Sequence, residues 1–385
     1  MMGNLGDTMM QGQPTIVDLF CGCGGFGLGA ELAGFKVLAA VDVDPNLQSA
    51  YRLNFPNVKA ELADISLLTK EFWRDTIGET KPDGVIGGPP CQGFSRIGLR
   101  QPEDPRNNLV MHFFKQVNIL QPKFFVMENV EGILDAQNKP TLELAIASVD
   151  KRYTVVGPFK VNALDCGAAT SRTRVVVVGY DPKCMSLPNL SALLNPDVKS
   201  ISVKEAISDL PSPYSIGDPL VVGGFKWVKV LNEEISEYAS KLRCAPLNGL
   251  GSSISVEMLA NGYVSGVLGT KHTPAVIERF TATLPGKIEA VSRYPRLSWD
   301  GYCPTLRAGT GSDKGSFQAM RPIHPLESRV ITVREAARLQ GFPDWFLFHP
   351  TIWHSFRMIG NSVSPVMSKY LLSILSESLL RRMAA

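Results

Sequence analysis

Short apolar runs alternate with stretches of helical spacing over the first half of the chain. Residues 15–20, 36–41 and 84–86 are apolar runs of strand length, and such short runs are typical of buried strands. Helical spacing follows the first run, and Pro45 stands where a helix prefers its first residue. Strands that alternate with helices predict an α/β fold with a doubly wound, mostly parallel sheet.

The same alternation continues further along the chain. Residues 107–120 have helical spacing, and residues 124–127 form a fully apolar run that ends at Glu128. Residues 153–161 and 174–180 are rich in β-branched residues, which favours a late pair of strands.

The alternation stops after about Asp181. Residues 182–220 are rich in Pro, Ser and Asn, and no clear strand–helix repeat returns before about residue 330. Thr332 and Glu335 then have the spacing of a capping box that opens a short helix. The pattern predicts four parts: a disordered start (1–14), a large α/β domain (15–181), a smaller, irregular second domain (182–320) and a C-terminal segment (321–385).

Composition restricts the class of protein only loosely. The chain has 385 residues, of which 44% are hydrophobic and 19% charged, as in an ordinary globular protein with a large core. The formal net charge is +3 and the sequence pI is about 8.4. This mild basicity is compatible with a polyanionic partner, and it argues against a histone-like, tail-driven binder.

The cysteines and the absence of targeting signals favour a reducing compartment. There are seven cysteines and no C-x-x-C pair, so a disulfide framework and a structural zinc site are both poorly supported. The first fourteen residues lack the features of a signal peptide, and no apolar run approaches the roughly 20 residues that span a bilayer. We therefore expect a protein of the cytoplasm or nucleus.

A glycine-rich loop follows the first predicted strand. Gly22, Gly24 and Gly27 fit the pattern G-x-G-x-x-G, and Asp42 ends the next strand. Such glycines let the backbone approach a nucleotide cofactor, and a carboxylate at that position binds ribose hydroxyls. Taken alone, the loop would also fit a plain tight turn between a strand and a helix.

Two further strands end in residues suited to catalysis. Residues 87–95 read Gly-Gly-Pro-Pro-Cys-Gln-Gly-Phe-Ser, which places Cys91 after two prolines that restrict the backbone. A cysteine on a loop at the carboxyl end of a strand is well placed as a nucleophile, although an isolated cysteine is more often a buried apolar residue. Glu128 reaches the same edge and could handle a proton, or it could simply cap a helix.

Together these segments resemble the cytosine-C5 methyltransferase family. The matching segments are, in family order, Asp18-Leu-Phe with the glycines that follow, Asp42, Asp64-Ile65, Pro-Pro-Cys91-Gln, Glu128-Asn-Val, Arg172-x-Arg174, Arg334-Glu-Ala-Ala-Arg-Leu-Gln-Gly-Phe-Pro343 and Gly360-Asn-Ser-Val363. The resemblance covers roughly residues 15–180 and 320–380. So many segments in one order are highly specific, whereas one motif could arise by chance.

The resemblance implies a Rossmann-like S-adenosylmethionine-dependent methyltransferase with a target-recognition domain at 182–320. It also implies that the last helix of segment 321–385 returns to the catalytic domain. It assigns the cofactor to Phe20, Gly22, Gly24, Gly25, Asp42, Asp64, Ile65, Pro90, Leu109, Asn361, Ser362 and Val363. It assigns catalysis to Cys91, Glu128, Arg172 and Arg174. Thr170 departs from the family's usual Gln, which affects a secondary contact, and Asp42 replaces the more usual Glu.

The implied reaction transfers a methyl group from S-adenosylmethionine to carbon 5 of a cytosine in double-stranded DNA and leaves S-adenosylhomocysteine. Cys91 would add to carbon 6, Glu128 would bond or protonate N3, and Arg174 would bond the carbonyl at position 2. The cytosine must first leave the helix stack. The resemblance implies no metal. It also implies a cytoplasmic, nucleoid-associated monomer of a bacterial or phage modification system, with a restriction endonuclease for the same site as a possible partner.

The second domain would read the DNA sequence. The candidate groups there are Lys226, Trp227, Lys229, Arg243, Lys271, Arg279, Arg293 and Arg296, although each charge could equally be a solvated surface residue. Arg334, Arg338 and Gln340 match a segment that supports this domain in the family, and Leu339 and Phe342 are expected core residues.

Three alternatives differ in substrate or class. A relative that acts on tRNA shares the catalytic set, but Gly93-Phe-Ser95 and the long recognition segment favour DNA. A nicotinamide-dependent oxidoreductase would share the glycine loop, but it leaves the segments around Cys91 and Glu128 unexplained. A non-catalytic relative is expected to lack Cys91, Glu128 or Arg174, and the sequence retains all three.

Overall fold

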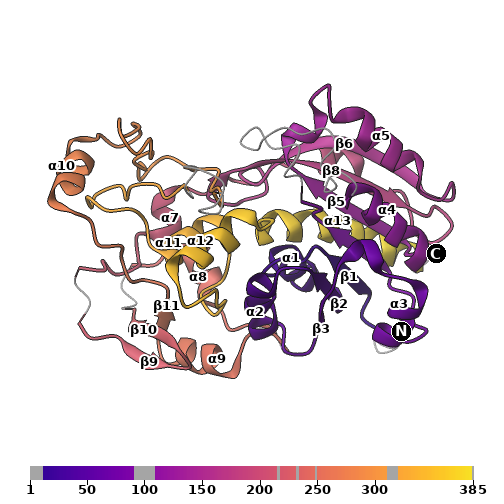
Figure 1. The fold of residues 1–385 in the computed structure, drawn as a ribbon, viewed down its shortest axis with the longest axis horizontal. Helices are drawn as coiled ribbons and strands as arrows, with labels where there is room; N and C mark the ends of the chain where they lie inside the picture. Colours follow the sequence, from indigo (N-terminus) through magenta and orange to yellow (C-terminus); the bar gives the residue numbers. More distant parts are fainter. Residues whose placement is uncertain are drawn as a thin grey trace, which may run out of the picture.

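The structure is a computed structural model that describes residues 12–90, 109–214, 217–230, 234–247, 249–309 and 320–383. Cys91 and most of the predicted disordered start lie outside these residues. Figure 1 shows two lobes, one around a large sheet and one that contains the small sheet β9–β11 and helix α10.

A seven-stranded sheet has the order β3-β2-β1-β4-β5-β8-β6. Its strands are β1 (Thr15–Leu19), β2 (Lys36–Asp42), β3 (Lys59–Leu62), β4 (Gly84–Gly87), β5 (Phe124–Asn129), β6 (Thr154–Asn162) and β8 (Thr173–Tyr180). Strands β1 to β5 are parallel to one another, whereas β8 runs antiparallel to both β5 and β6. The predicted doubly wound, mostly parallel sheet is therefore confirmed.

Alternate residues of the central strands enter two different cores, because successive side chains of a strand point to opposite faces. Ile16 and Val126 belong to a cluster with α1 and α13, whereas Val17 and Phe125 belong to a cluster with α4. The helices of this lobe are α1 (Gly25–Leu32), α2 (Pro45–Asn54), α3 (Lys70–Ile77), α4 (Leu109–Leu120), α5 (Lys139–Ala147) and α13 (Pro365–Met383), with short 3-10 turns η1 (Ile65–Leu67) and η3 (Glu131–Leu134). Burial on both faces explains why the strands read as continuous apolar runs.

The region after residue 181 contains more regular structure than its sequence indicates. It holds α6 (Leu190–Leu194), α7 (Val203–Ile207), α8 (Glu237–Arg243), α9 (Ser253–Ala260), α10 (Pro274–Ala282) and an antiparallel sheet of β9 (Leu220–Val222), β10 (Phe225–Lys229) and β11 (Tyr263–Ser265). A two-stranded pairing joins β7 (Thr170–Ser171) to β12 (Cys303–Pro304). Strands of two to five residues are too short to show a period in the sequence.

Helix α11 (Val333–Gln340) begins with the predicted capping box, in which the side chains of Thr332 and Glu335 each bond the other residue's backbone N–H. Its Arg338 forms a bidentate pair with Asp344, at 2.9 Å and 2.7 Å, and both side chains are fully buried. Arg338 also bonds Asp209, at 2.6 Å. This paired charge joins α11 to the turn after α7.

The end of the chain returns to the large sheet. Helix α12 (Ile352–Asn361) leads into α13, and the Ser368 hydroxyl donates to the carbonyl of Phe26 on α1, at 2.8 Å. A Cβ at Gly29 would lie 2.3 Å from Ser368, so glycine permits this close approach. Among the helices that the structure describes, none is both long and apolar enough to cross a bilayer.

Candidate cofactor and catalytic site

The loop between β1 and α1 has a backbone that requires glycine. Gly22 and Gly24 have φ of +56° and +102°, in the left-handed region that favours glycine. A Cβ at Gly25 would lie 2.1 Å from Ser362 Oγ and 2.3 Å from the Val363 carbonyl oxygen. The predicted cofactor loop is therefore in direct contact with two residues predicted to bind the cofactor from the far end of the chain.

Asp42 lies at the end of β2 and faces this loop. Its carboxylate accepts the Gly22 N–H at 2.8 Å and the Asp44 N–H at 2.9 Å. Burial raises the pKa of Asp42, and the two backbone amides partly oppose this rise. Each oxygen has a further lone pair beyond these bonds, so the predicted ribose ligand is held in place and can still accept a hydroxyl.

Asp18 is a second acid beneath the loop. It is fully buried, and a Cβ at Gly27 would lie 2.7 Å from its Oδ2. Burial and the neighbouring Asp42 raise the pKa of Asp18 well above its ordinary value. The sequence did not indicate a role for Asp18. In the structure its carboxylate leaves no room for a side chain at position 27, so glycine is required there.

Asp64 and Ile65 follow β3 at the same edge of the sheet. The Asp64 carboxylate is exposed, and bonds from the side chain and backbone of Ser66 lower its pKa. The Ile65 carbonyl accepts from Gln116 on α4, the helix that begins at Leu109. This bond holds the Asp64–Ile65 turn against the helix whose first residue is Leu109.

Two apolar side chains at this edge of the sheet are exposed to solvent, which the sequence motifs did not indicate. Val43, directly after Asp42, is 68% exposed, and Leu67, two residues after Ile65, is 74% exposed. Exposed apolar side chains beside predicted ribose and adenine contacts are candidates to pack against the adenine ring of the cofactor. For Val43, the signal in the sequence is an apolar residue directly after the acid that ends a strand.

The predicted contacts from the C-terminal segment lie around the end of α12. Asn361 is exposed, whereas Ser362 and Val363 are buried. Gln340 of α11 donates to the Ser362 carbonyl at 3.1 Å. The backbone here is thus fixed by the helix that carries Arg334 and Arg338.

Glu128 and Arg174 form an ion pair at the junction of β5 and β8. Glu128 Oε1 and Arg174 Nε are 2.8 Å apart, and each side chain is 10% exposed. Arg172 is buried beside them, and burial together with Arg174 lowers its pKa well below the ordinary value. Its Nε has no hydrogen-bond partner among the described residues. A carbonyl acceptor placed here would satisfy that donor.

The segment that leads to Cys91 lies against Glu128. A Cβ at Gly88 would lie 3.3 Å from Glu128 Oε2, and the Asn129 side-chain amide donates to the Pro89 carbonyl at 3.1 Å. Pro90, the next residue, is exposed. Cys91 itself lies outside the described residues, so the structure brings together only its predicted surroundings.

Thr170 and Arg172 contact the segment that precedes residue 310. The Thr170 hydroxyl donates to the Cys303 carbonyl at 3.1 Å, and Arg172 Nη1 donates to the Leu306 carbonyl at 3.1 Å. The departure at Thr170 therefore makes a bond across the β7–β12 pair. Arg172 uses one nitrogen to hold this segment, which the sequence did not indicate.

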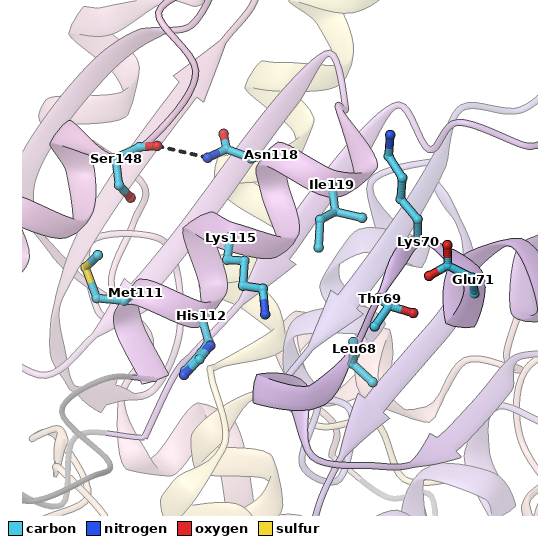
Figure 2. A pocket seen from close by; sticks show the side chains of 10 residues that line it. All are labelled: Leu68, Thr69, Lys70, Glu71, Met111, His112, Lys115, Asn118, Ile119 and Ser148. Atoms are coloured by element: carbon cyan, nitrogen blue, oxygen red, sulfur yellow. Dashed lines mark hydrogen bonds between the residues drawn. The ribbon is translucent and has the colours of Figure 1, made fainter.

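A separate open groove lies between α4 and the start of α3 (Figure 2). It is lined by Leu68, Thr69, Lys70, Glu71, Met111, His112, Lys115, Asn118, Ile119 and Ser148. No residue assigned above to cofactor or catalysis is among these, so the groove is distinct from the site.

Three of the eight candidate DNA-reading residues are internal. Trp227 is 1% exposed and donates to the Val222 carbonyl. Arg243 pairs with Asp209 at 2.6 Å, and Arg296 is 7% exposed and donates to four backbone carbonyls. The internal partners of these three side chains argue against a direct contact with DNA. The remaining candidates are half-buried Arg279, which pairs with Glu289, and exposed Lys226, Lys229, Lys271 and Arg293.

Comparison with known proteins agrees with this geometry. The profile of the C-5 cytosine-specific DNA methylases matches residues 14–377. The chain is 41% identical to the type II methyltransferase M.XorII of Xanthomonas oryzae pv. oryzae, over 93% of this chain and 83% of the relative. It is 32% identical to M.DdeI of Desulfomicrobium norvegicum, over 92% of this chain and 87% of the relative.

Solved structures are similar over nearly the whole chain. A DNA modification methyltransferase encoded within an Escherichia coli prophage has a TM-score of 0.84 and 38% identity, and the match covers 95% of this chain and 99% of that one. The Dnmt2 methyltransferase of Schizosaccharomyces pombe has a TM-score of 0.61 at 17% identity, over 95% of this chain and 99% of that one, which shows a shared fold alone.

Proposed function

We infer the roles of individual residues from one premise: the chain belongs to the C-5 cytosine-specific DNA methylase family and transfers a methyl group from S-adenosylmethionine to carbon 5 of cytosine in DNA. The observation that carries the residue assignments is the Glu128–Arg174 pair, at 2.8 Å, beside the segment that delivers Cys91. Membership of the family sets aside an oxidoreductase, and the retained Cys91, Glu128 and Arg174 argue against a non-catalytic relative.

The residues around the glycine loop fit the cofactor. The space that a side chain would fill at Gly22 is open, so the backbone there can approach a ligand, and Asp42 offers a held carboxylate for ribose hydroxyls. Phe20, Asp64, Ile65, Pro90 and Leu109 would surround the rest, with Asn361, Ser362 and Val363 on the C-terminal side. When bound, S-adenosylmethionine supplies the electrophilic methyl group.

The catalytic residues would activate a poor nucleophile. Carbon 5 of cytosine becomes reactive when the Cys91 thiolate adds to carbon 6, because the ring electrons then move toward carbon 5. Glu128 would bond or protonate N3 as charge develops there, and Arg174 with Arg172 would hold the carbonyl at position 2. Loss of the carbon-5 proton to a base then lets the Cys91 sulfur leave, which restores the thiolate.

The DNA must open for this reaction. A stacked cytosine cannot reach both a thiol and the cofactor, so the base is turned out into the pocket. We assign recognition to residues 182–320, where Lys226, Lys229, Lys271 and Arg293 are exposed. Charged groups of this kind contact phosphates and base edges.

The relatives suggest a cellular setting. M.XorII and M.DdeI are named as type II methyltransferases, so we propose that this enzyme protects DNA in a restriction–modification system with a cognate endonuclease. We further propose that it acts as a monomer, because one chain contains both the residues that would bind the cofactor and those that would hold the base. We place this monomer in the cytoplasm, associated with the nucleoid.

The direct test is Cys91→Ser. We expect this variant to lose methyl transfer to unmethylated genomic DNA while it binds S-adenosylmethionine normally, because the hydroxyl is a far weaker nucleophile than the thiolate. Radiolabelled transfer measures the first property and calorimetry the second. A covalent complex with DNA that contains 5-fluorocytosine should form with the natural enzyme and be absent from the variant. Equal transfer by both proteins would refute the covalent route.

A further inference from the structure

An ion pair connects helix α12, in the C-terminal segment, to the loop after Asp42. Arg357 Nη2 and Asp44 Oδ2 are 2.7 Å apart, although the two residues are 313 positions apart in the chain. Their side chains are 29% and 19% exposed. A pair that joins such distant segments constrains their relative position, because both groups are held within one hydrogen bond.

Asp44 transmits this constraint to the predicted ribose ligand. Its backbone N–H donates to Asp42 Oδ1, while its Oδ1 accepts the N–H groups of Asn46 and Leu47 and so caps α2. Asp44 Oδ2 remains for Arg357. One residue therefore fixes the start of α2, the orientation of Asp42 and the position of α12.

Arg357 also lies on the helix face that leads to the cofactor. Residues four apart on a helix lie on the same face, and Asn361 is four residues after Arg357. Trp353, four residues before, has its ring centroid 6.0 Å from the guanidinium carbon. The Arg357–Asp44 pair thus joins the two sides of the predicted cofactor site, Asp42 on one and Asn361 on the other.

We propose that Arg357 is a positioning residue for S-adenosylmethionine, which it helps to bind by holding Asp44, and through Asp44 the Asp42 carboxylate, against the end of α12. This inference rests on the proposed cofactor site. Arg357 does not take part in the chemical step, so its loss affects cofactor binding and leaves turnover at saturating cofactor unchanged.

The test is Arg357→Ala, with Asp44→Asn as its partner in a double-mutant cycle. Asparagine caps helices as well as aspartate does, so Asp44→Asn removes the charged partner and keeps α2 intact. We expect Arg357→Ala to raise the Kd and KM for S-adenosylmethionine about three- to tenfold, as for a partly exposed charged hydrogen bond, with kcat within about twofold. The double variant should be no weaker than Arg357→Ala alone, and Arg357→Lys should recover part of the affinity.

Two controls separate the possible failures. Arg381→Ala breaks the exposed Arg381–Glu377 pair on α13, at 3.4 Å, and should change neither constant. Asp42→Ala tests the site itself: normal cofactor binding by this variant would overturn the proposed site and the inference with it. Weak binding by Asp42→Ala with an unchanged Kd in Arg357→Ala would overturn the inference alone. A fall in kcat without a rise in KM, or additive effects in the cycle, would also overturn it.

Discussion

Replacement of Glu128 by Gln separates acid–base catalysis from structure. Glutamine keeps an oxygen that can face Arg174 Nε at the 2.8 Å position of Glu128 Oε1, but its amide cannot transfer a proton at neutral pH. The structural cost is the difference between a charge-assisted and a neutral hydrogen bond, about 1 kcal/mol. The catalytic cost is larger, because a positioned acid–base group contributes roughly 10²–10⁴-fold, or about 3–5 kcal/mol.

We therefore expect single-turnover methyl transfer to slow by about 10²–10⁴-fold, whereas the melting temperature falls by only about 2 °C. Radiolabelled transfer to genomic DNA without cytosine methylation measures the first quantity and calorimetric melting the second. Glu131→Gln is a matched control: Glu131 lies three residues further on, is 45% exposed and pairs with Lys160 at 2.9 Å. A loss of less than tenfold in Glu128→Gln would show that Glu128 mainly holds Arg174.

Two further predictions concern the frame of the site. Gly25→Ala should weaken S-adenosylmethionine binding and lower stability by about 1–3 kcal/mol, because the new Cβ would lie 2.3 Å from a backbone oxygen, whereas Gly217→Ala, with open space around it, should do neither. Burial alone would raise the pKa of Asp344, but its pairing with Arg338 outweighs burial and holds the pKa below the ordinary value. The pair should therefore stabilise the folded protein fully above about pH 4 and progressively less as the pH falls through the folded-state pKa of Asp344. Urea unfolding should show the Asp344→Asn variant to be about 3–5 kcal/mol less stable than the natural protein at pH 7, and its stability should depend less on acid. Equal acid sensitivity of the two proteins would contradict this reasoning.

The sheet and its glycine loop could be predicted because their signals are local. The apolar runs of β1, β2 and β5 are bounded by residues that end strands, and Pro45 and the capping box at Thr332 mark helix starts directly. The order of motifs along the chain then predicted the contents of the site. Each of these features depends on residues within a few positions of one another, so the sequence records them.

The remaining features depend on partners that are distant in the chain. Arg243 and Arg296 carry the same charge as a DNA-binding residue, and only the fold shows that Asp209 and four carbonyls already hold them. The bond from Asn129 to Pro89 spans 40 positions. A charge or an amide in a sequence gives the chemistry of a side chain but not its partner, which is why the sequence could not show which candidate DNA-reading residues have partners inside the protein.

The proposed cofactor site is completed by two segments that are separated in the chain by the whole of the proposed recognition region. Gly25 meets Ser362 and Val363, Phe26 accepts from Ser368, and Gln340 of α11 donates to the Ser362 carbonyl. Anything that shifts α11 or α12 relative to the sheet must therefore alter the walls of the cofactor site. Thermodynamic linkage makes such an effect reciprocal: if DNA binding changes the position of the recognition lobe, it changes cofactor affinity by the same factor by which the cofactor changes DNA affinity. The contacts of residues 361–363 thus provide a physical route by which the enzyme can bind its two substrates cooperatively.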